Sequence, residues 1–66
     1  MDFEDVRWLL EEHGWEYRRE RGSHVTFKKR GAGTITIPKR RGRVVARPYI
    51  DMVIKALELD DDSNSS

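Results

Sequence analysis

The chain has no cysteine, only two histidines and no long apolar segment. Without cysteine it can form neither a disulfide framework nor a thiolate metal site. Because the two histidines lie far apart in the sequence, a zinc site is not expected either, and we expect no metal and no cofactor. No apolar run approaches the roughly 20 residues that span a bilayer, and the N-terminus lacks the apolar region of a signal peptide. These absences predict a soluble cytoplasmic protein with no membrane partner.

At 66 residues the chain has room for one small domain with two layers around a single core. We expect this domain to cover residues 1–59. Residues 60–66 are polar and acidic with nothing to bury, so they are expected to form a disordered tail. The residues expected to form the core, besides the apolar face of the last helix, are Phe3, Val6, Trp8, Leu9, Leu10, Trp15, Tyr17, Val25, Phe27, Ile35 and Ile37.

Two segments have the apolar periodicity of amphipathic helices. The first covers residues 3–13, with Asp2 as its expected cap and Gly14 as its expected stop. The second begins near Pro48, which suits the first turn of a helix because its missing N–H is not needed there. The apolar face of this second helix would consist of Ile50, Val53, Ile54 and Leu57.

Between the two helices, apolar and polar residues alternate in the period of half-buried strands. The predicted strands cover residues 15–20, 24–29 and 34–37, and Pro38 ends the third. The order predicts an α+β fold, α-β-β-β-α, in which a three-stranded antiparallel sheet has both helices on one face and solvent on the other. The solvent face would carry Glu16, Arg18, His24, Thr26, Lys28, Thr34 and Thr36, and strict alternation also turns Glu20 outward.

Positive charge is concentrated in the middle of the chain. Residues 18–47 contain eleven arginines and lysines against one acid, Glu20, for a net charge of +10. The other residues contain two cations and eleven acids, so the whole chain carries only +1. This segregation is typical of a surface that binds a polyanion such as RNA. The cations expected to contact RNA are Arg18, Lys28, Lys29, Arg30, Lys39, Arg40, Arg41 and Arg43.

His24 opens the second predicted strand, directly after the Gly22-Ser23 turn and beside these cations. An imidazole can accept or donate a proton near neutral pH, and surrounding cations can stabilise charge on a phosphorane, so the pair of features suits RNA cleavage without a metal. Ser23 and Lys28 are candidate supporting groups. The residues alone leave open that His24 is an ordinary exposed strand residue and that the basic loop is merely solvated.

The order of elements, with Gly22-Ser23-His24 opening the second strand, resembles the HicA family of toxins. The resemblance extends over about residues 3–59 and includes His13-Gly14-Trp15 after the first helix and Thr34-Ile35-Thr36-Ile37-Pro38 in the third strand. It implies a fold similar to the double-stranded RNA-binding domain and a metal-independent endoribonuclease that cleaves mRNA. It also implies His24 as the catalytic histidine and a HicB-type antitoxin as the protein partner.

The sequence departs from the family pattern in two places. Lys39 and Arg40 stand where many members have a second histidine, and the last helix begins with Ala46-Arg47-Pro48-Tyr49. A non-catalytic RNA-binding module, with the same fold and charge but no useful proton transfer, is the alternative function. A third possibility is an interaction module whose basic face binds an acidic protein.

Overall fold

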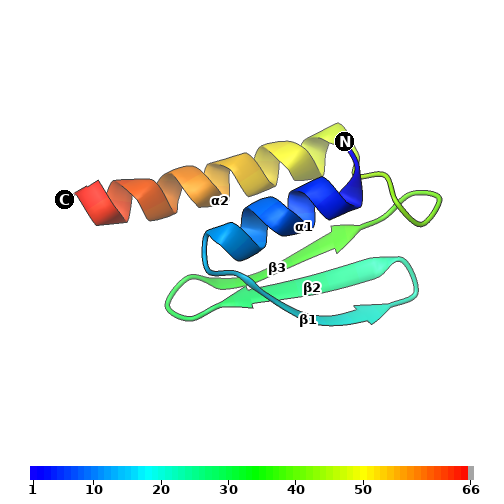
Figure 1. Ribbon diagram of the computed structural model, residues 1–66, viewed down its shortest axis with the longest axis horizontal. Helices are drawn as coiled ribbons and strands as arrows, with labels where there is room; N and C mark the ends of the chain where they lie inside the picture. The colour runs from blue at the N-terminus through cyan, green and yellow to red at the C-terminus, as the bar shows by residue number, and fades with distance from the viewer. Residues whose placement is uncertain (66) are drawn as a thin grey trace.

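The computed structural model describes the backbone of residues 1–65 and the side chains of residues 1–58. Along the chain follow α1 (Phe3–Glu12), β1 (Glu16–Arg21), β2 (His24–Lys29), β3 (Gly33–Pro38) and α2 (Arg47–Ser65) (Figure 1). The predicted α-β-β-β-α order is confirmed. The acidic tail expected at 60–66 falls among the residues without described side chains, and its disorder stays a prediction.

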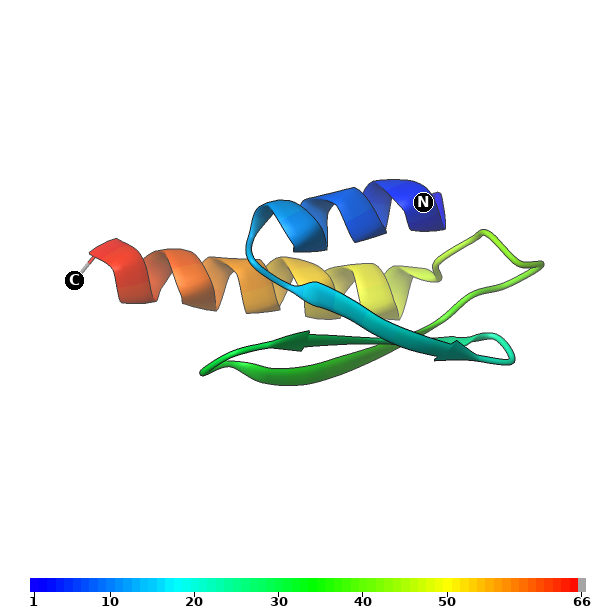
Figure 2. The same ribbon diagram turned by 60° about the horizontal axis from the view of Figure 1, so that its bottom comes forward.

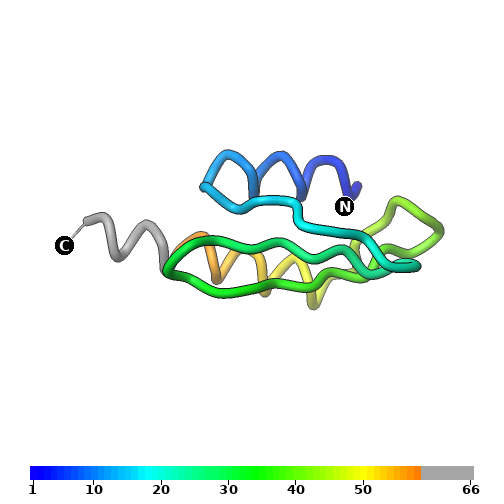
Figure 3. The backbone as a smooth tube through the Cα atoms, turned by 90° about the horizontal axis from the view of Figure 1, so that it is seen from below, coloured from blue at the N-terminus to red at the C-terminus, as the bar shows by residue number. Residues whose placement is uncertain are grey.

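The strands form one antiparallel sheet in the order β1-β2-β3. Figure 2 shows both helices on the same side of this sheet, and Figure 3 shows the strands from the uncovered side, with α2 behind them. In the part of the chain that the structure describes, neither helix combines the length and apolar character needed to cross a bilayer. The two-layer arrangement with one open face is therefore the one predicted from the alternation.

The core lies between the helices and the covered face of the sheet. Phe27 is fully buried, with its ring centroid 6.1 Å from that of Phe3 and 5.9 Å from that of Tyr17, the latter pair edge to face. Burying each such large apolar side chain contributes about 1.5–3 kcal/mol. The buried residues are Phe3, Val6, Leu10, Trp15, Val25, Phe27, Ile35, Ile37, Val45 and Val53, so most of the predicted core is confirmed.

Two residues predicted to be buried lie at the surface. The Trp8 side chain is 61% exposed because Trp8 falls on the face of α1 opposite Val6 and Leu10. Ile54 is 47% exposed, since it lies at the edge of the stripe centred on Val53. Asp2 precedes α1 but makes no side-chain hydrogen bond to it; its backbone carbonyl accepts the N–H groups of the first turn instead.

The predicted bounds of β2 are confirmed, and those of the other elements were wrong by about one residue. His13 is not in α1 but follows it, and Gly14 then takes a φ of 90°, which a side chain would disfavour. The N–H groups of His13 and Trp15 both donate to the Leu10 carbonyl, which closes the end of the helix. β1 consequently begins at Glu16 and extends to Arg21.

A β-bulge in β1 changes which residues face the helices. Tyr17 pairs with Phe27 and Arg19 pairs with Thr26, which leaves Arg18 as an extra residue between the two pairs. After the bulge the alternation is reversed, so Glu20 pairs with buried Val25 on the helix side. The expectation that Glu20 faces outward was therefore wrong, because strict alternation cannot anticipate an inserted residue.

Candidate nucleic-acid interface

His24 lies at one end of the uncovered sheet face. It opens β2 opposite Arg21 of β1 and is flanked on the other side by Pro38 of β3. Its side chain is exposed, and among residues 1–58 no hydrogen bond or ion pair holds its imidazole. The ring is thus free to approach a ligand that lies across the sheet.

The turn that precedes His24 is a two-residue hairpin loop formed by Gly22 and Ser23. Gly22 has a φ of 60° at the first central position, where type II′ hairpin turns place glycine. The Ser23 carbonyl accepts the N–H of Lys39 at 2.7 Å, so the turn is bonded to the chain that leaves β3. Ser23 itself is exposed, and it directly precedes His24 in the sequence.

The bulge gathers three cations on the open face. Arg18, Arg19 and Lys28 line a hollow of about 330 Å³ together with Thr26 and Thr34. A second, smaller hollow of about 180 Å³ continues from it and is lined by Glu16, Arg18, Lys28 and Arg30. Arg18 forms an exposed ion pair with Glu16 at 3.4 Å, whereas Arg19 and Lys28 have no acidic partner among residues 1–58.

The basic loop after β3 lies at the same end of the sheet as the Gly22-Ser23 turn (Figure 1). Arg40 and Val44 exchange backbone hydrogen bonds of 2.7 and 2.9 Å, which closes the loop into a tight turn with Arg41 and Gly42 at positive φ. The Arg43 carbonyl accepts the N–H of Phe3, so the loop is also fixed to the start of α1. This geometry presents the exposed Arg40, Arg41 and Arg43 beside the His24 end of the sheet.

Two of the expected RNA-contacting cations lie on the helix side instead. The Lys39 amino group is 2.8 Å from a Glu20 carboxylate oxygen and 4.8 Å from the centre of the Phe3 ring, and its side chain is only 13% exposed. Lys29 pairs with Gly33 in the register of the covered face, and its side chain approaches Gly14 near the end of α1. Both side chains therefore contact groups on the helix side of the sheet and do not add to the cations of the open face.

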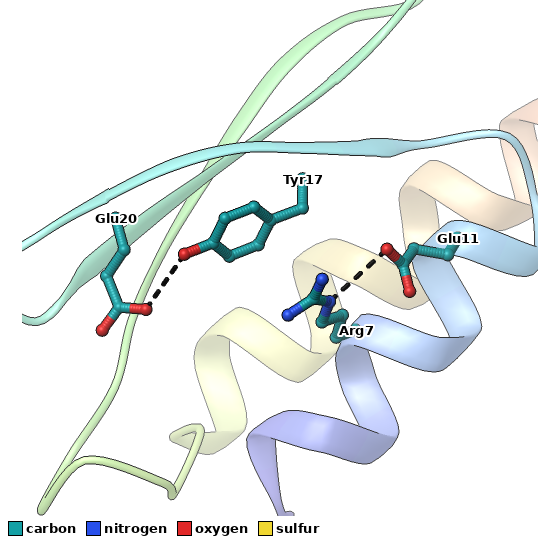
Figure 4. A network of polar contacts seen from close by, with 4 residues as sticks. All are labelled: Arg7, Glu11, Tyr17 and Glu20. Carbon is teal, nitrogen blue, oxygen red and sulfur yellow. Dashed lines mark hydrogen bonds and ion pairs between the residues drawn. The ribbon is translucent and has the colours of Figure 1, made fainter.

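The Glu20–Lys39 ion pair connects β1 to the start of the basic loop. Tyr17 donates its hydroxyl to the other Glu20 oxygen at 3.2 Å, and Arg7 of α1 lies 4.4 Å over the Tyr17 ring (Figure 4). The hydrogen bond and charge of Lys39 hold the pKa of the Glu20 carboxyl below its ordinary value, against a smaller opposing effect of burial. The pair thus positions Lys39, and with it the chain entering the loop.

Sequence reasoning missed Arg19 and Arg21 as site residues. Both face the open side because Arg19 is paired with Thr26 and Arg21 with His24, and cross-strand partners share a face. The available signal was the Arg18-Arg19-Glu20-Arg21 run, in which a bulge after Tyr17 turns Glu20 to the face opposite Arg19 and Arg21 while Tyr17 stays on the covered face. Among the described residues, no three histidines, aspartates or glutamates gather as metal ligands would.

Residues 3–59 of the chain match the family model described as the HicA toxin of bacterial toxin–antitoxin systems. The match covers both helices of the fold, up to residue 59, and all three strands, so it includes the open face and the basic loop. No curated protein and no solved structure matches the chain.

Proposed function

Since the chain belongs to the HicA toxin family, we propose that it is an endoribonuclease that cleaves mRNA and acts as the toxin of a toxin–antitoxin pair, with His24 as its general acid–base residue. The observation that carries this proposal is the position of His24, exposed on an uncovered sheet face, opposite Arg21 and between a cationic hollow and a basic loop. Proton transfer and phosphate binding are thereby available on one surface without a metal or cofactor.

In this proposal the reaction is an internal transesterification. His24 accepts the proton of a ribose 2′-OH while the 2′-oxygen bonds to the adjacent phosphorus and the bond from phosphorus to the 5′-oxygen breaks. The products are a 2′,3′-cyclic phosphate and a 5′-hydroxyl end. Arg21, directly across the strand pair, would stabilise the negative charge of the phosphorane, and water or the protonated His24 would supply the proton to the leaving oxygen.

Lys28 is placed for binding more than for proton transfer at the same phosphate. It lies four residues from His24 on the same face of β2, which is roughly 13 Å along a strand. Ser23, which adjoins His24, is better placed to bond an oxygen of the phosphate that is cleaved. The basic loop with Arg40, Arg41 and Arg43 would hold the RNA beyond His24 at the other end.

The antitoxin partner belongs to the same proposal. An inhibitor that covers the open face would block both RNA binding and His24 at once, and the excess of cations there favours an acidic partner surface. A HicB-type antitoxin is the partner that the family implies. The cytoplasm, where mRNA is translated, would be the compartment of both proteins.

One observation favours a non-catalytic RNA-binding module as the second candidate. No partner among residues 1–58 orients the His24 imidazole, although catalytic histidines are usually held by a further hydrogen bond. The same surface without an oriented base would bind RNA and leave it intact. The two candidates therefore differ in cleavage and agree in binding.

The test compares the two histidines of the chain. Purified wild type, His24→Ala and His13→Gln are incubated with a long single-stranded RNA in EDTA. His13 is the matched control, because its ring nitrogen bonds the Leu9 carbonyl at 2.9 Å beyond the end of α1, away from the open face. Loss of a general acid–base residue lowers the rate by about 100- to 10,000-fold, so we expect cleavage by wild type and His13→Gln alone.

Both variants must remain folded for this comparison to count. Since His24 is exposed, its replacement should change the free energy of unfolding by no more than about 0.5 kcal/mol, which thermal melting would check. Equal cleavage by His24→Ala would remove His24 from the mechanism. Saturable RNA binding by all three proteins without cleavage would establish the binding module instead.

A further inference from the structure

The larger hollow on the open face has the composition of an anion site. Two guanidinium groups and one ammonium group line it, from Arg18, Arg19 and Lys28, together with the hydroxyls of Thr26 and Thr34. Among residues 1–58 no carboxylate lines this hollow; Glu16 lines only the adjoining smaller one, where it pairs with Arg18. Arg19 and Lys28 have no acidic partner among the described side chains, so two positive charges there remain uncompensated.

The ligand chemistry that fits these groups is a phosphodiester. Guanidinium groups bond phosphate oxygens in a bidentate fork, and threonine hydroxyls donate to the same acceptors. None of the described residues that line the hollow is aromatic, so they offer no platform on which a base could stack. Recognition there would be of the sugar–phosphate backbone and would carry no sequence information.

The register of the sheet fixes how far the hollow lies from His24. Thr26, the residue of the lining that lies nearest His24 along β2, is two residues from it on the same face, a separation of about 7 Å. Neighbouring phosphates of an extended RNA strand are separated by a similar distance. We propose that this hollow binds the phosphate next to the one that His24 acts on, so that the substrate must be an RNA with at least two linked phosphodiesters.

The bulge is what makes this site possible. Without the extra residue in β1, one arginine would face Thr26 where Arg18 and Arg19 now both face the hollow. This inference rests on the proposed function for its position relative to the cleaved bond. The anion site itself depends only on the geometry of the bulge.

A neutral linkage tests the register directly. Cleavage of a long RNA first gives one cleavage position, and short RNAs around it are made with a single ribose 2′-OH, so that one bond alone can be cut. A methylphosphonate, which lacks the negative charge, then replaces either the preceding or the following phosphate. Removing one charge-assisted hydrogen bond corresponds to a roughly tenfold lower kcat/KM. We expect this tenfold decrease when the methylphosphonate stands at one of the two positions and no decrease when it stands at the other.

The variant Arg19→Gln tests which side chain binds this neighbouring phosphate. On the fully charged RNA the variant should also have a kcat/KM about tenfold below that of the wild type. On the RNA with the sensitive neutral linkage it should show no further decrease, because the same hydrogen bond is already absent. Lys55→Gln, an exposed cation on α2, is the matched control and should cleave each RNA as the wild type does.

Two results would overturn the inference while leaving the proposed function in place. One is that neither neutral linkage slows a cleavage that still requires His24; the other is that the effects of Arg19→Gln and of the neutral linkage multiply. If the wild type cleaves no RNA, the proposed function and the register relative to His24 both fail. Titration with inorganic phosphate, followed by amide chemical shifts, then still decides whether an anion binds at Thr26 and Thr34.

Discussion

Glu20 illustrates how one inserted residue changes the role of a side chain. It is the single acid among the cations of residues 18–47, and on the open face it would repel RNA. The bulge turns it toward the helix side, where its two oxygens accept the Lys39 ammonium and the Tyr17 hydroxyl. The acid is thereby removed from the open face and fixes the start of the basic loop.

This ion pair predicts a pH-dependent contribution to stability. Because the folded pKa of Glu20 is lowered from its ordinary value of 4.5, the contribution is complete above that value and is lost as pH falls through the lower folded pKa. Glu20→Gln should therefore have a lower urea midpoint than the wild type at pH 7, and the difference should vanish in acid. Glu12→Gln, exposed and unpaired among residues 1–58, is the control; a Glu20→Gln deficit that persists in strong acid would contradict the assignment.

The two tryptophans show a limit of sequence reasoning at the scale of single residues. Trp15 is buried and Trp8 is exposed, although the apolar pattern predicts both in the core. The indole N–H of Trp15 has no hydrogen-bond partner among the described residues, which costs about 1–3 kcal/mol against the burial of its ring. Trp8 avoids that cost by its position on the outer face of α1, which follows from the helical phase of Val6 and Leu10.

At the scale of elements, the bulge in β1 has its own testable consequence. Deleting either arginine of the Arg18-Arg19 pair gives the same sequence, in which the remaining arginine pairs with Thr26. All other pairs of β1 with β2 are kept, so Glu20 still faces Lys39, and the free energy of unfolding should change by no more than about 1 kcal/mol. Urea denaturation and a cross-strand contact between Glu20 and Val25 would check this.

Deletion of Thr36 is the matched control, because β3 pairs with β2 without irregularity. There the removal of one residue must move either Ile35 or Ile37 out of the core, since side chains alternate between faces. We expect this second deletion to leave the domain unfolded. Unfolding by the arginine deletion as well would show that Arg18 is part of a regular ladder rather than an insertion.

The elements themselves could be predicted because their patterns are local. Alternation around Val25 and Phe27, and around Ile35 and Ile37, turns these four residues into the core, as the structure has them. The bulge could not be predicted, because it depends on pairing between strands and not on the period within one. His24 is therefore placed correctly from the sequence, whereas Arg19, Arg21, Lys29 and Lys39 are assigned to the wrong side or overlooked.

At the scale of the whole molecule, charge is divided between the two layers. The open face and the basic loop carry most of the cations, while acids predominate on α1, at Glu4, Asp5, Glu11 and Glu12. The net charge of +1 is therefore the sum of a strongly positive layer and a strongly negative one. Such a molecule should orient toward RNA with its sheet foremost and bind it with an affinity that depends on salt.

The salt dependence tests whether the basic loop belongs to this surface. Each phosphate that a cation neutralises releases counterions, so on a single strand the slope of log affinity against log salt decreases by about 0.7 for each phosphate that is no longer neutralised. Arg40→Gln with Arg41→Gln should therefore lower the magnitude of the slope by up to about 1.4 and weaken binding at low salt.

The control is Arg47→Gln with Lys55→Gln, which removes the same charge from exposed positions on α2. An equal change in both double variants would mean that net charge alone attracts the RNA. A change confined to the loop variant would place the RNA across the His24 end of the sheet, where the turn and the basic loop lie side by side.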